Sequence, residues 1–204
     1  MIVNALDQAW QAWIDLGQRL EPDQWERPTR LAGWTVRHVF AHHADVPAMI
    51  GEALDAGPEP DGAATFADAA QLLAFLQRPG GIAEAAAGQI REAGVADERT
   101  GPQLVERLAA APRTVARLRE QDLSGLVPYF GLGTVPAREV LRVQLMEAVV
   151  HYLDLAEALG LPRPGPVAGA PLRETAALLA AIADPMRLVE AATGRGGQVF
   201  PVLR

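Results

Sequence analysis

Apolar residues recur at intervals of three and four positions along most of this chain, whereas alternating runs rich in valine, isoleucine and aromatic residues are nearly absent. This periodicity is typical of helices that bury one face. The sequence therefore predicts an all-α protein. Since 204 residues suffice for one sizeable hydrophobic core, we expect a single domain with an appendage.

Proline and glycine divide the helical pattern into segments. The expected helices cover approximately residues 4–20, 35–54, 66–91 with an interruption at 79–81, 102–121 with a kink at Pro112, 136–159 and 172–192. Thr35 suits the start of the second helix, and Gly160 suits the left-handed end of the longest one. The second helix ends before the break at Gly57–Pro60. We interpret Gly131–Gly133 as a turn, and the last residues, Phe200–Arg204, as an irregular tail.

The composition excludes several classes of function. The chain has no cysteine, so it has no disulfide, no thiolate ligand and no cysteine nucleophile, and thiol chemistry would need a thiol from outside. A net charge of -7 argues against nucleic-acid binding, which depends on neutralising phosphates. The sequence lacks an apolar stretch of membrane-spanning length and the basic start of a signal peptide, so we expect a cytoplasmic protein with no membrane partner.

The longest predicted helix carries a polar stripe within apolar surroundings. Glu147 and His151 are four residues apart and therefore project from one face of the helix. Asp154 continues the stripe three residues later. Because burying an unpaired charge costs several kcal/mol, these side chains need partners. A divalent metal ion would satisfy Glu147 and His151 together, provided that a third ligand exists.

The second predicted helix offers three histidines as the third ligand. His42 and His43 both flank its apolar face, so the periodicity does not choose between them, whereas His38 points away. Two histidines and one carboxylate are typical of catalytic zinc, nickel or iron sites. The alternative is a site without metal, in which Glu147 pairs with an arginine such as Arg142 and His151 donates to a carbonyl.

Two stretches resemble a known family. The first stretch resembles the N-terminal signature of the mycothiol-dependent maleylpyruvate isomerase family, which is part of the wider DinB/YfiT-like superfamily. It consists of Pro28–Arg37, with the sequence Pro-Thr-Arg-Leu-Ala-Gly-Trp-Thr-Val-Arg, followed by Ala41-His42. The second stretch resembles the other metal motif of that family. It consists of Glu147–His151, with Asp154-Leu155 and Ala158–Gly160 after it. The resemblance covers roughly residues 1–160 and implies an antiparallel four-helix bundle with a metal near one end.

The resemblance also implies roles for single residues. His42, Glu147 and His151 match the metal ligands of the family, with His43 as the second choice beside His42. Asp154 matches a recurrent aspartate that would orient the site by a hydrogen bond. Gly33-Trp34 would shape the helix entry and pack the core, and His38 would be a solvated surface histidine. In domain terms, the resemblance implies that residues 1–160 form the metal-binding domain and that residues 161–204 form a linker, a C-terminal helix and a tail.

The function that the resemblance implies is a divalent-metal-dependent thiol transferase or isomerase. Its cofactors would be zinc, or else nickel or iron, and a low-molecular-weight thiol such as mycothiol, which attacks a small electrophilic substrate. Arg142 or Arg195 would hold a substrate carboxylate. Two alternatives stay open: a hydrolase that activates water at the metal, and a non-catalytic metal-binding protein of the stress response. Family members often form homodimers, so we expect one here.

Overall fold

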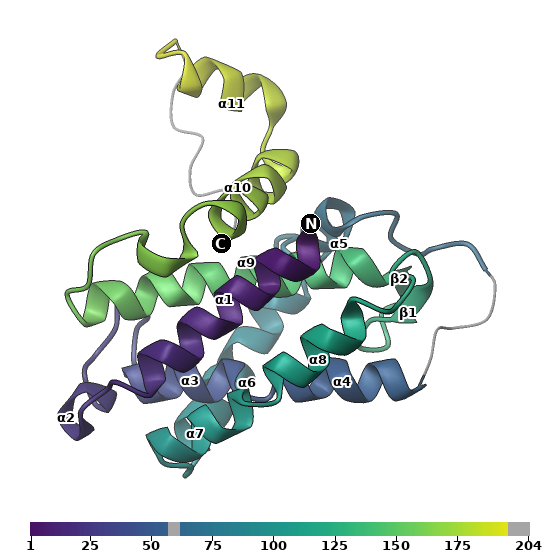
Figure 1. Ribbon diagram of the computed structural model, residues 1–204. Helices are drawn as coiled ribbons and strands as arrows, with labels where there is room; N and C mark the ends of the chain where they lie inside the picture. Colours follow the sequence, from purple (N-terminus) through teal and green to yellow (C-terminus); the bar gives the residue numbers. More distant parts are fainter. Residues whose placement is uncertain (57–61, 196–204) are drawn as a thin grey trace.

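The computed structural model describes residues 1–56 and 62–195, and it is mostly helical (Figure 1). The helices of its first half are, in chain order, α1 (Ile2–Gly17), α2 (Pro22–Trp25), α3 (Val36–His43), α4 (Val46–Ala56), α5 (Ala69–Leu76) and α6 (Ile82–Ala96). The remaining elements are α7 (Gly101–Leu108), α8 (Ala111–Leu118), β1 (Leu126–Pro128), β2 (Thr134–Pro136), α9 (Ala137–Ala158), the 3-10 helix η1 (Gly165–Val167), α10 (Ala170–Ile182) and α11 (Pro185–Ala192).

Four helical columns make up the bundle, and two of them consist of two helices each. The columns are α1, α3 with α4, α7 with α8, and α9. Helix α1 packs against α9, α7 and α8, while α3 contacts α9 and α4 contacts α8. This arrangement confirms the expected all-α class and the four-helix bundle. The last helices extend it: α10 packs on α9, α5 and α1, whereas α11 contacts mainly α10 and projects from the body (Figure 1).

The core of the bundle is built on large side chains from three columns. Trp10 and Trp13 of α1 and Phe40 of α3 are completely buried, and the Trp13 and Phe40 rings meet edge to face at 5.0 Å. Helix α9 adds Leu145 and Leu155, which are also buried. Helix α9 buries two carboxylates against its neighbours, Glu139 and Asp154, whereas the Glu147 side chain is 36% exposed.

The longest predicted helix is confirmed within one residue at each end. Helix α9 begins directly after Pro136 and ends at Ala158. Gly160 adopts φ +66°, and the Leu161 N–H donates to the Ala156 carbonyl at 2.8 Å. This left-handed closure is the one that glycine favours.

Three predicted helices are each divided in two, and proline is near every division. The predicted helix 35–54 stops at His43 and restarts at Val46, with Pro47 in the first turn of α4. The helix predicted over 102–121 breaks between α7 and α8 instead of bending at Pro112, because Pro112 occupies the first turn of α8, where its missing N–H costs nothing. Similarly, Pro185 begins α11. The predicted break at 79–81 is confirmed, since α5 and α6 flank it.

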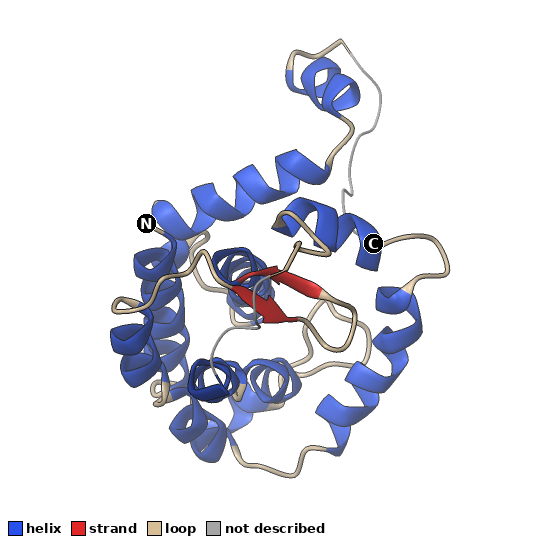
Figure 2. Cartoon of the chain, turned by 90° about the vertical axis from the view of Figure 1, so that its right-hand side faces the viewer, coloured by secondary structure: helices blue, strands red, loops and turns tan. Residues whose placement is uncertain are grey.

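A short hairpin precedes α9, which the expected all-α pattern did not include. Strands β1 and β2 pair antiparallel, with Val127 opposite Val135. Gly131–Gly133 lies in the connecting turn, as predicted, and Gly133 takes φ +134°. Figure 2 shows this hairpin among the helices at one end of the bundle. The predicted break at 57–60 and the predicted tail at 200–204 lie outside the described residues.

Candidate metal centre

Helix α9 brings three polar side chains onto one line. Glu147, His151 and Asp154 follow each other at helical spacing, and the surrounding core leaves the His151 side chain 15% and the Asp154 side chain 3% exposed. The Nε2 atom of His151 lies 3.4 Å from Glu147 Oε2, and its Nδ1 atom lies 2.9 Å from Asp154 Oδ2. The imidazole is therefore held between two carboxylates, one on each ring nitrogen.

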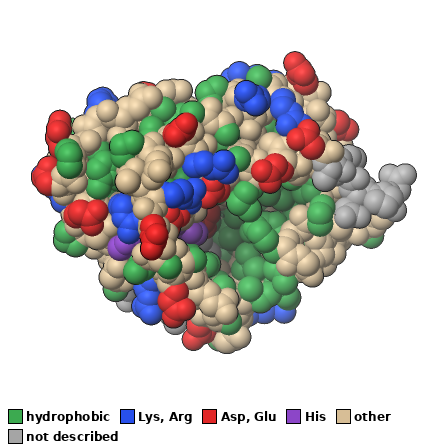
Figure 3. Space-filling view, turned by 90° about the horizontal axis from the view of Figure 1, so that it is seen from below, with side chains coloured by type: hydrophobic (Ala, Val, Ile, Leu, Met, Phe, Trp, Pro, Cys, Tyr) green, Lys and Arg blue, Asp and Glu red, His purple; other side chains and the backbone are tan. Residues whose placement is uncertain are grey.

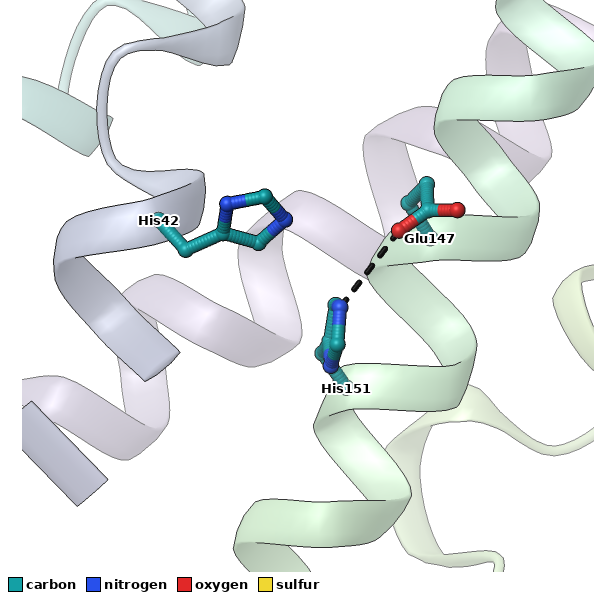
Figure 4. A group of neighbouring side chains, drawn as sticks. All are labelled: His42, Glu147 and His151. Carbon is teal, nitrogen blue, oxygen red and sulfur yellow. Dashed lines mark ion pairs between the residues drawn. The ribbon is translucent and has the colours of Figure 1, made fainter. Parts of the chain in front are cut away.

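Helix α3 brings His42 to the same place. Each of His42, Glu147 and His151 offers one ligand atom, and these atoms lie within 4.8 Å of one another (Figure 4). The His42 and His151 rings are nearly perpendicular, with centroids 5.2 Å apart. Two imidazole nitrogens and one carboxylate oxygen form a donor set that fits zinc, nickel or iron and leaves further positions on the ion for other ligands.

His43 lies in the core and not in this group. Its side chain is 1% exposed and stacks on Trp13, with ring centroids 4.6 Å apart. Its Nε2 atom has no hydrogen-bond partner among the described residues. Burial, with the charges of His151 and His42 as smaller causes, lowers the pKa of His43 to about 3, so this imidazole is neutral at physiological pH.

The electrostatics of the group favour a cation. Burial acts to lower the pKa of His151, but hydrogen bonds and charges from Asp154 and Glu147 outweigh it and raise the pKa to about 9. Burial acts to raise the pKa of Glu147, yet the interaction with His151 lowers it overall. Burial and the charge of His151 lower the pKa of His42. Without a metal ion, the positive charge beside Glu147 is thus a proton on His151.

Trp34 packs against both imidazoles. Its ring lies edge to face with His42, centroids 5.4 Å apart, and nearly parallel to His151 at 6.4 Å. The indole is 8% exposed, so it shields one side of the group from water. Seen from below, the molecule has a hollow with histidine side chains at its edge and hydrophobic side chains along one wall (Figure 3).

Comparison with known proteins assigns the sequence to a family. The family model of the mycothiol maleylpyruvate isomerase N-terminal domain matches residues 6–156. The chain belongs to this family.

Two solved structures resemble the whole chain. The crystal structure of the mycothiol-dependent maleylpyruvate isomerase has 18% sequence identity and a TM-score of 0.54, and the alignment covers 97% of this chain and 72% of that chain. A histidine-to-alanine mutant of the mycothiol-dependent maleylpyruvate isomerase has 17% identity, a TM-score of 0.56 and the same coverage. At these identities the likeness shows the shared fold. A search of curated protein sequences found no match.

In this maleylpyruvate isomerase-like fold, Arg142 and Arg195 bond to partners outside the group of His42, Glu147 and His151. Arg142 Nη1 donates to Glu139 at 3.0 Å. The two contacts expected for the alternative without metal, Arg142 with Glu147 and His151 with a carbonyl, are wrong, because Arg142 bonds to Glu139 and both ring nitrogens of His151 face carboxylates. Arg195 follows α11, and its guanidinium donates to the Thr193 carbonyl at 3.4 Å. Binding of a substrate carboxylate by either arginine stays a prediction.

His38 is half-buried and caps its own helix, in place of the solvated surface role expected for it. The Thr35 N–H donates to His38 Nδ1 at 3.1 Å, which ties the backbone at the start of α3 to its first turn. Thr35 is the N-cap residue, as the sequence indicated. This capping fixes the start of the helix that carries His42.

Sequence reasoning missed two residues beside the centre. Arg30 Nε donates to Asp154 Oδ1 at 2.6 Å, across 124 positions of sequence. Tyr129 of the hairpin is buried in the cluster that includes Val143 and Met146 of α9. Burial and, secondarily, the charge of Glu147 raise the pKa of Tyr129 to about 12. Helical spacing carries no signal for either residue, since both come from non-helical segments.

None of the helices in the described part of the chain combines the length and the apolar character needed to cross a membrane.

Proposed function

We propose that this chain is a divalent-metal-dependent enzyme that activates a low-molecular-weight thiol of the mycothiol type for reaction with a small electrophilic substrate. One observation carries the proposal: His42 from α3 and Glu147 and His151 from α9 converge within 4.8 Å. They do so in a chain that belongs to the mycothiol maleylpyruvate isomerase N-terminal domain family.

His42, Glu147 and His151 would hold the ion, and zinc fits their two nitrogens and one oxygen. A bound divalent ion lowers the pKa of a thiol and supplies thiolate at neutral pH. Since the chain has no cysteine, the thiol comes from a separate molecule. The absence of an internal thiol also removes the competing ligand that a cysteine side chain would be.

The remaining residues of the centre prepare these ligands. The Asp154 carboxylate accepts a hydrogen bond from the Nδ1–H of His151, which leaves Nε2 on the side of Glu147. Glu147 contributes one negative charge, which offsets part of the charge of an ion. Trp34 holds both imidazole rings by contact and excludes water on its side.

The test begins with elemental analysis of zinc, nickel, iron and manganese in the purified full chain and in two variants, His42→Ala and Glu147→Ala. We expect near-stoichiometric metal in the wild type and its loss in both variants. His43→Phe is the matched control, because it removes the neighbouring imidazole but keeps a ring to stack on Trp13. A folded wild type that takes up none of these metals after reconstitution would contradict the proposal.

The second part of the test concerns the thiol. We expect the metal-loaded protein to convert maleylpyruvate or another small electrophile only when mycothiol or a related thiol is present. Conversion without any thiol would indicate a hydrolase. Stoichiometric metal with no conversion across a panel of electrophiles and thiols would indicate a non-catalytic metal-binding protein.

A further inference from the structure

The Asp154 carboxylate lies between two partners and uses a different oxygen for each. Oδ1 accepts from Arg30 Nε at 2.6 Å, and Oδ2 faces His151 Nδ1 at 2.9 Å. The Asp154 side chain is 3% exposed, so water does little to hold it. The orientation of this carboxylate, and with it the direction of the His151 ring, therefore depends on the guanidinium.

Arg30 belongs to a tightly bonded turn that leads directly into α3. The Thr29 N–H donates to the Trp34 carbonyl at 2.9 Å, and the Trp34 N–H donates to the Leu31 carbonyl at 2.9 Å. Arg30 is thus fixed to the segment that carries Trp34 and continues to His42. The Arg30–Asp154 pair joins this segment to α9, which carries the other two members of the group.

We propose that Arg30 is a positioning residue for His151, acting through Asp154; this inference rests on the proposed metal-dependent function. Arg30 holds the carboxylate so that it accepts a hydrogen bond from the Nδ1–H of His151 and leaves Nε2 aimed at Glu147 and the neighbouring His42. Partners of this outer kind that orient a ligating histidine are typically worth 10–100-fold in metal affinity. Without the guanidinium, Oδ1 of this buried carboxylate loses the donor that Arg30 provides, and the carboxylate turns.

Arg163 provides a matched control for the same surface. Arg30 Nη1 donates to Glu157 Oε2 at 3.1 Å, and Arg163 Nη1 donates to the same oxygen at 2.7 Å. Both side chains are similarly exposed, at 44% and 50%. Of the two, Arg30 is the one that bonds to Asp154. Removing Arg163 therefore disturbs Glu157 and the surface charge but leaves the Asp154–His151 contact in place.

The experiment measures binding of Co²⁺ to the full chain by titration and records the visible d–d absorption of the bound ion, which reports its ligand geometry. We expect Arg30→Met to weaken binding by about 10–100-fold and to change the absorption. Arg163→Met should stay within about twofold of the wild type, and Arg30→Lys should recover part of the loss because its ammonium restores a positive charge and a donor but not the planar guanidinium.

A double-mutant cycle separates positioning from a general structural effect. If Arg30 acts through Asp154, then Arg30→Met should change affinity less than about twofold when it is added to Asp154→Asn. Wild-type affinity and absorption in Arg30→Met, equal losses in Arg30→Met and Arg163→Met, or additive losses in the double mutant would each overturn the inference. These three results would contradict the role of Arg30 but not the proposed metal site. A wild type that does not bind Co²⁺ would overturn the proposed function as well.

Discussion

Two of the glutamates on helix α9, Glu139 and Glu147, lie in polar clusters whose other members differ in kind. Glu139, in the first turn, is 5% exposed and accepts hydrogen bonds from the Ala69 N–H at 3.1 Å and from Arg142 at 3.0 Å. Arg138 adds a third contact at 3.3 Å. Glu147, two turns later, faces imidazoles instead: His151 at 3.4 Å and the nearby His42.

The difference shows what distinguishes a structural carboxylate from a candidate ligand. The partners of Glu139 are a backbone N–H and guanidiniums, which donate protons that they do not release near neutral pH. An imidazole can give up its proton and offer a lone pair to a cation. The cluster of Glu139 is therefore complete as it stands, whereas the charge next to Glu147 can be a proton or a metal ion.

Exchanging each glutamate for glutamine should give the largest contrast. Glu147→Gln keeps the shape but removes the charged ligand, so we expect affinity for Zn²⁺ to fall by more than about 100-fold, beyond the effect of outer partners. The matched Glu139→Gln variant should keep wild-type affinity. Competition with a chromophoric chelator measures both. Equal losses in the two variants would erase the distinction between the clusters.

The affinity for Zn²⁺ should depend on pH, because the proton on His151 competes with the metal ion beside Glu147. Because the pKa of His151 is raised to about 9, its Nε2 proton must leave before a metal binds. Affinity for Zn²⁺ should therefore fall about tenfold per unit, or about 100-fold, between pH 8 and pH 6. The same competition assay measures this affinity. An affinity for Zn²⁺ that does not change over this pH range would contradict the exchange of the His151 proton for the metal ion.

The metal-free protein should respond to pH in the opposite direction. The folded-state pKa of His151 lies above its ordinary value of 6.5, so the stabilisation from its protonated form is complete below about pH 6.5 and is lost as pH rises through 9. Urea unfolding at pH 7 and pH 10, with chelator present, should show lower stability at pH 10. The comparison with Glu147→Gln isolates this site, because that variant removes one of the two carboxylates that raise the pKa.

Glu139→Gln should affect stability rather than metal binding. The amide keeps an acceptor for one donor but leaves the charge of Arg142 uncompensated, so we expect the free energy of unfolding to fall by about 1–3 kcal/mol. Urea denaturation of metal-free protein gives the value. A metal-free Glu147→Gln variant that loses as much stability would show that the two clusters contribute alike to the fold.

The smallest effect is expected for Arg138→Ala. The Arg138 side chain is 64% exposed and contacts Glu139 at 3.3 Å. Exposed ion pairs contribute little, so unfolding free energy should change by less than about 1 kcal/mol. Arg142→Ala is the counterpart. Because the Arg142 side chain is 29% exposed, its removal should lower the free energy of unfolding more than the removal of Arg138. The reverse order would mean that exposure does not govern the strength of these contacts.

The helical class and the longest helix could be predicted from the sequence because both depend on local periodicity. The points at which the other predicted helices divide were harder to predict from the sequence. Pro112 was expected to kink a helix, yet it begins α8, because a proline fits a first turn as readily as it breaks an interior. The hairpin of β1 and β2 was missed since its strands have three residues each, too few for a pattern of alternation.

The sequence by itself determined that Glu147, His151 and Asp154 share a face, because the 3.6-residue period of a helix fixes the relation of residues four and three apart. It did not separate His42 from His43. Only the tertiary structure directs His42 toward α9 and His43 onto Trp13, and only it joins Arg30 to Asp154. Such contacts depend on how helices and turns pack across the core, and no spacing along one segment encodes that packing.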